Sequence, residues 1–354
     1  MSRRLRVGVI GLGRVAQLHH LPNLAASPRA EVSALCDLSH GLAGDVARAY
    51  GLPSSAVASS AGDLMSRDVD AVLIANRHHG PLVLRALKAG LHVLVEKPVC
   101  WGMDEAAAIE RQERASRSSV VVGYMKRYDP AFLRLLDRTD PPMLVRLRVF
   151  AGARHKHERL HQSIKGRDVA GHSAAEAAAV DSQITASLGD DAPGRVRDVR
   201  TLAELAIHDL NLAQALAGPL TLREAHRFAT PFGPGFTVLL SANGIPVHLE
   251  VVPDFETARD WDETLTAYFP HETVELRFGS PFLRSAPTVL HERCAAGTDV
   301  VNREVIASRD SAYRLELEHF IDCSLGMATP RTSVLGSVAD LALVYEIASR
   351  MRDL

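Results

Sequence analysis

The stretch VIGLGRVAQLHH, residues 9–20, decides the fold. It places Gly11, Gly13 and Ala16 in the spacing GxGxxA directly after an apolar run near the start of the chain. In a strand–turn–helix unit, Gly11 permits the tight turn and Gly13 lets the backbone approach a pyrophosphate, while Ala16 lets helix and strand pack closely. The phosphates then lie at the helix N-terminus. The alternative is a glycine turn that binds no ligand.

Short apolar runs alternate with helical patterns over roughly the first 125 residues, as in a parallel sheet covered on both faces. The runs are LRVGVI (5–10), EVSALC (31–36), DAVLIA (70–75), HVLV (92–95) and SVVVGY (119–124). Helical spacing of apolar residues predicts helices over 15–25, 42–50, 81–89 and 105–115. Gly51 and Gly90 follow two of these segments as C-cap glycines. The pattern predicts an α/β domain with a doubly wound parallel sheet.

Asp37 follows the second apolar run, about 20 residues past the glycines, where a carboxylate binds the ribose hydroxyls of adenosine. It would repel a 2′-phosphate, and Leu38, Ser39 and His40 include no arginine to hold one. NAD is therefore expected, with NADP less favoured. The alternative role for Asp37 is to cap a helix that begins near Gly41.

Composition excludes several classes of protein. The chain has 354 residues, 47% of them hydrophobic and 23% charged, and a net charge of −2, which gives no reason to expect nucleic acid or a membrane surface as partner. No apolar run reaches the ~20 residues that span a bilayer. The opening MSRRLR runs into VGVIGLGR without the apolar region of an export signal. Together with four widely spaced cysteines, these features predict a cytoplasmic protein with reduced thiols.

Lys97 lies in LVEKPV, residues 94–99, which we place at the end of a fifth strand. The chain has five lysines and 35 arginines, so a lysine here suggests a group that must give up its proton near neutral pH. The alternative is a solvated charge at a strand end.

Five segments, taken in order, resemble the Gfo/Idh/MocA family of nicotinamide-dependent oxidoreductases over nearly the whole chain. They are VGVIGLGRVAQLHHLPNL, DAVLIA…ALKAGLHVLVEKPV, VVGYMKRYDPAF, ELAIHDLNLAQALAG and TPRTSVLGSVADLALVYEIA. The resemblance implies a Rossmann domain, here 1–123, followed by a substrate-binding and oligomerisation domain, here 124–354. That second domain is expected to carry a large, mostly antiparallel open sheet, and its last helix to pack back on the first domain.

Alternating runs in the second half support this layout. MLVRLRVF, LREAHRFA, GFTVLLSA, IPVHLEVV, ETLTAYF and ETVELRF are predicted as strands. In the family the open face of such a sheet is often covered by another subunit, so the resemblance implies a homodimer or homotetramer.

The resemblance also implies the site residues. Lys97 and His208 handle the proton that leaves a secondary alcohol as hydride is transferred. The residues assigned to the cofactor are Gly11, Gly13, Arg14, Val15, Asp37, Asn76, His79 and Glu96. Tyr124 and Arg127, after a sixth strand, and Glu204 are assigned to the substrate; Arg127 has a structural salt bridge as its alternative.

Glu204 lies four residues before His208, so both side chains share one face of a helix. Most family members carry aspartate there, which leaves the role of Glu204 and the substrate class open. The alternative is an ordinary surface pair.

Residues 155–200 depart most from the family pattern and are interpreted as an insertion. It covers the cleft or contacts a neighbouring subunit; the alternative is a poorly ordered loop. His157 and His161 have metal-ligand spacing, but no supporting pattern recurs, so no metal is expected.

The sequence thus predicts an NAD(H)-dependent oxidoreductase acting on the CH–OH group of a sugar, amino sugar or cyclitol. Two alternatives remain: transient use of NAD in a net non-redox elimination or hydrolysis of a sugar, and a non-catalytic dinucleotide sensor.

Overall fold

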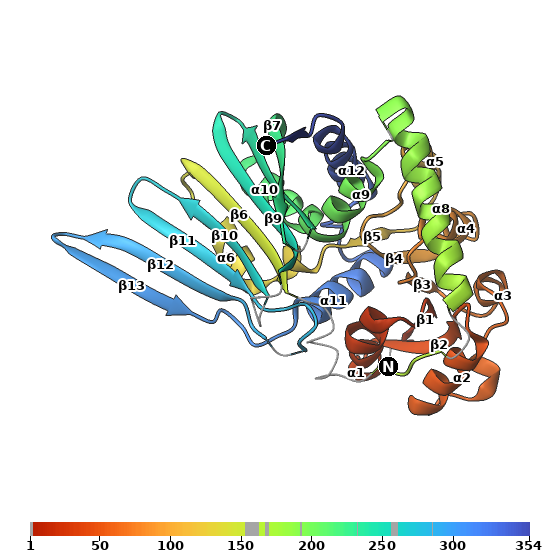
Figure 1. The fold of residues 1–354 in the computed structure, drawn as a ribbon. Helices are drawn as coiled ribbons and strands as arrows, with labels where there is room; N and C mark the ends of the chain where they lie inside the picture. Colours follow the sequence, from red (N-terminus) through yellow and green to blue (C-terminus); the bar gives the residue numbers. More distant parts are fainter. Residues whose placement is uncertain are drawn as a thin grey trace. The chain divides into compact units, whose positions relative to one another are not determined.

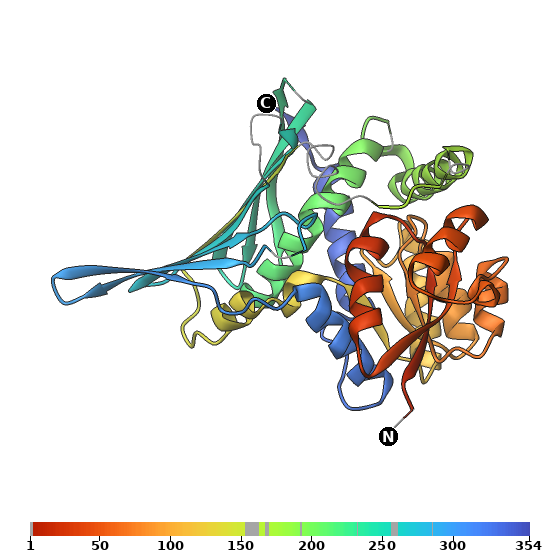
Figure 2. The ribbon, with the colours of Figure 1, turned by 90° about the horizontal axis from the view of Figure 1, so that it is seen from below.

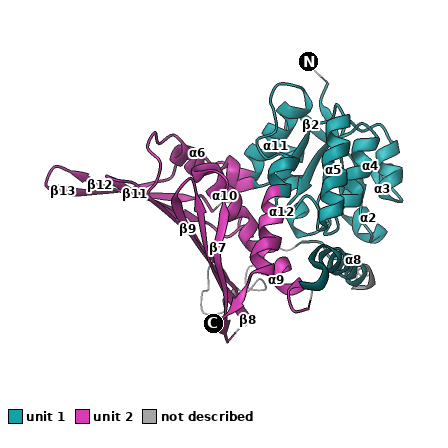
Figure 3. Ribbon diagram, turned by 90° about the horizontal axis from the view of Figure 1, so that it is seen from above, with its two compact units in different colours: residues 1–124, 162–192, 313–338 teal, residues 125–161, 193–312, 339–354 magenta. Residues whose placement is uncertain are grey.

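The computed structural model describes residues 3–152, 163–166, 170–191, 193–231, 233–255, 261–284 and 286–354. These residues form two compact units, coloured separately in Figure 3. The first comprises 1–124, 162–192 and 313–338, and the second 125–161, 193–312 and 339–354. The sequence predicts a single boundary, at 123/124. In the structure the chain leaves the first unit after residue 124 and returns to it twice, at 162–192 and 313–338.

A parallel sheet forms the centre of the first unit (Figure 1). Among the described residues it has five strands in the order β2-β1-β3-β4-β5. They are β1 (Leu5–Ile10), β2 (Ala30–Cys36), β3 (Ala71–Ile74), β4 (His92–Glu96) and β5 (Val120–Gly123). Residues of β3 and β5 are buried on both faces, as expected for apolar runs covered by helices. The doubly wound sheet is confirmed, but the strand ending at Glu96 is the fourth, not the fifth, and the one before Tyr124 is the fifth, not the sixth.

Helices connect these strands close to the predicted ranges. They are η1 (Ala16–His20), a π-helical segment, then α1 (Leu21–Ala26), α2 (His40–Ala49), α4 (Gly80–Lys88) and α5 (Met103–Ala115). Gly51 and Gly90 follow their helices with φ of +65° and +73°, the left-handed conformation expected of C-cap glycines. The short segments η2 (Ser54–Ala56) and α3 (Ala61–Ser66) were not predicted, because a single turn leaves no readable periodicity.

Two later segments complete the first unit. One contains α8 (Ala170–Leu188) and η4 (Gly189–Asp191); the other contains most of α11 (Ala312–Ser324) and the start of α12 (Val334–Ser349). Arg29 forms ion pairs with Glu318 (3.1 Å) and Asp322 (2.6 Å) of α11. The Val122 amide of β5 donates to the Thr332 carbonyl (2.9 Å). These contacts bind the C-terminal helices to the parallel sheet.

The second unit is built on a mixed, mostly antiparallel sheet. In the described residues it has nine strands in the order β13-β12-β11-β10-β6-β9-β8-β7-β14. They are β6 (Leu144–Gly152), β7 (Thr221–Thr230), β8 (Gly233–Ala242), β9 (Ile245–Phe255), β10 (Asp262–Tyr268), β11 (Glu272–Phe278), β12 (Val289–Ala296), β13 (Asp299–Val305) and β14 (Arg352–Asp353). All six predicted strands are confirmed; β12, β13 and β14 were missed. Within this second sheet, β6–β9 and β7–β14 are the only parallel pairs among the described strands.

One face of this sheet is covered by helices (Figure 2). In β6, Val145, Leu147 and Val149 are buried, and η5 (Leu202–Ala206) packs on β6 and β9. The unit also contains η3 (Met125–Tyr128), α6 (Pro130–Leu136), α9 (Val196–Thr201) and α10 (Ile207–Ala217). On the opposite face Arg146 pairs with Glu250 (3.7 Å), a polar surface that alternation along β6 predicts.

Candidate functional site

The sheet order places a crevice at the carboxyl end of β1. From β1 the chain crosses first to β2 on one side and later to β3 on the other, so the connections diverge there. Ligands of open α/β sheets bind at such a switch point. A cavity of about 830 Å³ lies here, lined by the residues that end the three strands and the loops that follow them. Its volume is in the range of small-molecule and cofactor sites.

The two glycines of the first turn have different structural roles. Gly11 has φ +86°, and a Cβ built there would lie 2.3 Å from the Asn76 backbone nitrogen. A Cβ at Gly13 would meet nothing within 4 Å. Gly11 therefore allows the turn to pass close to the loop after β3. Gly13 instead leaves open space beside the backbone where a pyrophosphate would approach.

The helix after the turn opens beside the same cavity. Arg14 and Gln17 line it, while Ala16 is only 1% exposed, as its predicted packing role requires. Val15, assigned to the cofactor from the sequence, is not among the lining residues. Unpaired backbone N–H groups at a helix N-terminus favour an anion.

Asp37 lines the cavity and also braces the glycine turn. Its Oδ2 accepts a hydrogen bond from the Leu12 amide (2.7 Å), and its Oδ1 accepts one from the Ser39 amide (2.9 Å). The N-cap of α2 is Ser39, whose side chain accepts from the Leu42 amide. The alternative reading of Asp37 as the helix cap is therefore wrong, since the cap lies two residues later.

Asn76 belongs to the same cavity. Its Nδ2 donates to the His78 carbonyl (3.0 Å) and to Glu176 Oε1 (2.8 Å), whereas its Oδ1 is buried without a partner among the described residues. A buried carbonyl oxygen of this kind requires a hydrogen-bond donor. His79, in contrast, is buried and does not line the cavity.

Lys97 is partly buried directly after β4, in a cluster of titratable groups. The peptide bond between Lys97 and Pro98 is cis.

Two titratable neighbours of Lys97 have shifted pKa values. Burial lowers the pKa of His79 to about 4. The Lys97 charge lowers it further and the Glu96 charge opposes the shift, so the imidazole is neutral at pH 7. His20 Nε2 lies 2.8 Å from Glu96 Oε1. Burial acts to raise the pKa of Glu96, but His20 and the Lys97 charge outweigh it and hold the carboxyl ionised. Glu96 therefore contacts His20 and does not line the cavity.

Glu316 of α11 adds a second buried carboxyl to this unit. It is fully buried and neither oxygen has a partner among the described residues. Burial raises its pKa well above the usual value, and the Glu96 charge acts in the same direction. Burial therefore favours the protonated, neutral form of Glu316.

Glu316 should make the protein less stable as pH rises. Because its pKa is higher in the folded than in the unfolded chain (about 4.3), its favourable contribution is complete below that value. It is lost as pH rises through the folded pKa. We expect Glu316→Gln to unfold at higher urea concentration than the wild type at pH 8, with the difference shrinking towards pH 5. A difference independent of pH in urea melts at pH 5, 6, 7 and 8 would contradict this.

The remaining predicted residues are not among those that line this cavity. Tyr124 is 1% exposed and its hydroxyl donates to Ser337 Oγ (3.3 Å), so it serves the packing of the first unit and we leave it out of the substrate site. Glu204 and His208 belong to the second unit, on η5 and α10, and both are partly exposed while Leu202, Ala206 and Ile207 are buried. They therefore share the polar side of one helical run, as the spacing predicts.

Arg127 is held within the second unit. Its Nη1 donates to Asn211 Oδ1 (3.0 Å), and Asn211 donates to Asp340 (2.6 Å). Next to it, Lys126 is buried and forms ion pairs with Glu263 and, at 3.9 Å, Asp209. Burial raises the pKa of Asp209 and so favours its neutral form.

Sequence reasoning missed Gln17, Lys165 and Glu176, which all line the cavity. Lys165 carries the same signal that singled out Lys97, a rare lysine in an arginine-rich chain. Nothing in the sequence linked residues 163–176 to the glycine turn, because that contact joins positions about 150 residues apart.

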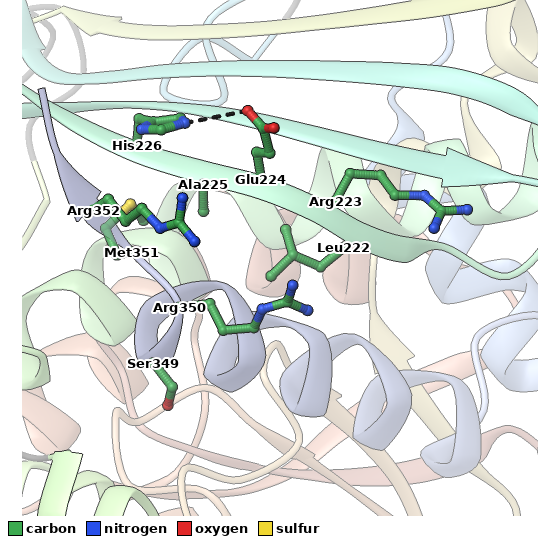
Figure 4. Close-up of a pocket in the computed structure, with 9 residues that line it drawn as sticks. All are labelled: Leu222, Arg223, Glu224, Ala225, His226, Ser349, Arg350, Met351 and Arg352. Carbon is green, nitrogen blue, oxygen red and sulfur yellow. Dashed lines mark hydrogen bonds and ion pairs between the residues drawn. The ribbon is translucent and has the colours of Figure 1, made fainter.

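A smaller cavity of about 310 Å³ lies in the second unit between β7 and the end of α12 (Figure 4). Arg223, Arg350 and Arg352 line it, and His226 lies 3.4 Å from Glu224 (Nε2–Oε2). None of the residues predicted from the sequence line it.

Within the described residues no group of three or more His, Cys, Asp or Glu side chains has the arrangement of a metal site. His157 and His161 lie outside those residues. No helix in the described ranges is both long and apolar enough to cross a membrane.

Comparison with known proteins identifies relatives for the first unit. Residues 5–124 match the model of the Gfo/Idh/MocA oxidoreductases, described as having an NAD-binding Rossmann fold. The chain is 35% identical over 150 residues to an inositol 2-dehydrogenase/D-chiro-inositol 3-dehydrogenase of Shouchella clausii. That match covers 40% of this chain and 43% of the relative. It is 31% identical over 143 residues to the scyllo-inositol 2-dehydrogenase (NAD(+)) of Bacillus subtilis, covering 40% and 41%. The chain thus matches about two-fifths of the length of these relatives.

Solved structures match over the whole chain. KijD10, a 3-ketoreductase from Actinomadura kijaniata crystallised with NADP, aligns with a TM-score of 0.74 at 17% identity over 99% of both chains. UDP-N-acetylglucosamine 3-dehydrogenase GnnA from Acidithiobacillus ferrooxidans aligns with a TM-score of 0.72 at 20% identity, over 99% of this chain and 98% of the other. At this identity the likeness establishes the two-part fold.

Proposed function

We propose that the chain, whose residues 5–124 match the model of the Gfo/Idh/MocA oxidoreductases, transfers hydride between NAD(H) and a secondary alcohol or ketone. The proposed substrate is a sugar, amino sugar or cyclitol. The relatives named as inositol dehydrogenases and the 3-ketoreductase and 3-dehydrogenase of similar fold support that class.

The cavity at the carboxyl ends of β1, β2 and β3 carries the proposal. The glycine turn and the helix N-terminus would hold the pyrophosphate, with open space beside Gly13 for its approach. Asp37 and the buried Asn76 Oδ1 would accept hydrogen bonds from ribose hydroxyls. Bound NAD would supply the hydride acceptor or donor.

Lys97 is proposed to move the substrate's hydroxyl proton. Lys97 lies beside the ionised Glu96 and the neutral His79. A lysine in partly buried surroundings gives up its proton more readily than an arginine. His208 is proposed as its partner in proton transfer, and Glu204 and Arg127 as groups that bind substrate hydroxyls.

NADH is proposed as the preferred cofactor because Asp37 brings a carboxylate to the edge of the cavity. Titration with NADH and NADPH, followed by nicotinamide fluorescence, tests the proposal. We expect Kd for NADH to be about tenfold or more below that for NADPH, since a carboxylate opposes the 2′-phosphate. Binding of neither would refute the function. Equal binding would refute only the cofactor preference.

Asp37→Asn should lower Kd for NADPH by about tenfold, because it removes the charge but keeps one acceptor for the turn. Asp45→Asn is the matched control: Asp45 lies on α2, pairs with Arg48 (2.9 Å) and does not line the cavity. If both variants bind NADPH as the wild type does, Asp37 does not decide the preference.

Substrate screening with sugars and cyclitols then separates the proposal from its nearest alternative. Accumulation of NADH from NAD supports net oxidation. A product formed without NADH would instead support the transient use of NAD. We also propose, from the family resemblance, that the helix-free face of the second sheet joins two or more copies of the chain.

A further inference from the structure

The predicted insertion contributes directly to the dinucleotide cavity. Ser163, Ile164, Lys165 and Gly166 line it together with Ser173 and Glu176 of α8. All of these residues belong to the same compact unit as the glycine turn. The inference below rests on the proposed function, because it assigns these residues a role in holding the dinucleotide.

Gln17 ties residue 164 to the glycine turn. Its Nε2 donates to the Leu12 carbonyl (2.6 Å) and to the Ile164 carbonyl (3.0 Å), and its Oε1 accepts from the Ile164 amide (2.8 Å). The nitrogen and the oxygen of the Gln17 amide both form hydrogen bonds, and these hold the backbone of residue 164 beside Leu12. Leu12 lies between Gly11 and Gly13, in the turn that would hold the pyrophosphate.

Glu176 provides a second attachment, to the loop that follows β3. Its Oε1 accepts from Asn76 Nδ2 (2.8 Å), which directs the Asn76 amide so that its oxygen remains the available group. The contact joins the first turns of α8 to the loop that follows β3.

The rest of α8 is packed on the same unit. Gln183 Nε2 donates to Glu105 Oε1 (3.2 Å), and Ser187 Oγ accepts from the Met103 amide (3.0 Å) at the start of α5. Val180, Ile184 and Leu188 recur every fourth residue and are buried. The helix is thus held along its length and is not a loosely attached loop.

The charged side chains that line the cavity indicate what residues 163–166 do. Arg14, Arg77 and Lys165 line the cavity against two carboxylates, Asp37 and Glu176. Lys165 directly follows Ile164, which Gln17 holds beside the glycine turn, and the exposed side chain of Lys165 lines the cavity. An ammonium group beside the turn complements the two negative charges of a pyrophosphate.

We propose that residues 163–166 and the N-terminal half of α8 form a clasp on the dinucleotide cavity, and that Lys165 binds the pyrophosphate of the cofactor. Gln17 and Glu176 are positioning residues that fix the two ends of this clasp. The described residues 163–166 and the start of α8 are therefore part of the cofactor site.

Binding of fragments tests the role of Lys165. Lys165→Met should raise Kd for NADH and for ADP-ribose alike by about ten- to hundredfold, the value of a charge-assisted hydrogen bond, and leave Kd for adenosine within about twofold. Lys88→Met is the matched control, since Lys88 is exposed on α4 and does not line the cavity. Unchanged Kd for ADP-ribose in Lys165→Met would overturn the proposal.

Hydrogen exchange of the Ile164 amide tests the contact between Gln17 and residue 164. In the wild type, ADP-ribose should slow exchange of the Ile164 amide at least tenfold. In Gln17→Leu, which removes the bonded group, this protection should be lost while NADH still binds with a Kd raised about tenfold. Full protection in Gln17→Leu would contradict the clasp.

The same data separate this inference from the proposed function. A wild type that binds neither NADH nor ADP-ribose would overturn both. A wild type that binds both ligands, together with variants indistinguishable from it, would overturn the clasp alone.

Discussion

Replacing Lys97 with Met should lower kcat by about a thousandfold, the range that a positioned acid–base group contributes. The physical reason is that a thioether cannot take or release the substrate's proton. NADH binding should be nearly unchanged, because Lys97 does not line the dinucleotide cavity. Steady-state kinetics with the best substrate of the screen and NADH titration measure the two effects separately.

Lys97→Arg is the matched variant. It retains a positive charge but does not deprotonate near neutral pH, so it should be as inactive as Lys97→Met. If Lys97→Arg kept more than a tenth of wild-type kcat, charge alone would suffice and the proton-transfer role would be refuted. If Lys97→Met also kept more than a tenth of wild-type kcat, Lys97 would have no role in proton transfer.

Gly11→Ala should lower stability and Gly13→Ala should weaken NADH binding, although they are the same substitution two residues apart. At Gly11 the new Cβ would lie 2.3 Å from a backbone nitrogen, at φ +86°. We expect the free energy of unfolding to fall by about 2–4 kcal/mol, from the left-handed backbone and the overlap together.

At Gly13 a Cβ would meet nothing within 4 Å, so stability should change by less than about 0.5 kcal/mol. The methyl group would occupy the space through which a pyrophosphate approaches, and Kd for NADH should rise at least tenfold. Urea unfolding and NADH titration of both variants check these results. A stable Gly13→Ala protein that binds NADH normally would show that the phosphates lie elsewhere.

The parallel sheet could be predicted because its signals are local. LRVGVI, DAVLIA and SVVVGY are apolar on both faces, which only a strand covered on both sides tolerates in a soluble domain. The strands that were missed, β12 and β13, have mostly half-buried or exposed residues, so no apolar alternation marks them. Ser39 and Asp37 are both suitable helix caps by residue type, and only the backbone conformation decides between them.

The candidate site was predicted in part. Gly11, Gly13, Arg14, Asp37 and Asn76 line one cavity, whereas Val15, His79 and Glu96 do not. Tyr124 follows a strand and carries a polar group, and the sequence alone does not show that its hydroxyl is buried against Ser337, 213 residues later.

The glycine turn, the strands around it and the placement of Asp37 and Lys97 at strand ends follow from the amino-acid sequence, because each depends on neighbours within a few residues. Only the tertiary structure decided which distant groups complete the cavity. Gln17 meets Ile164 across 147 positions and Asn76 meets Glu176 across 100. Such pairs follow from the path of the chain in space, and hydrogen-bonding side chains at either position are common enough in any sequence to give no local signal.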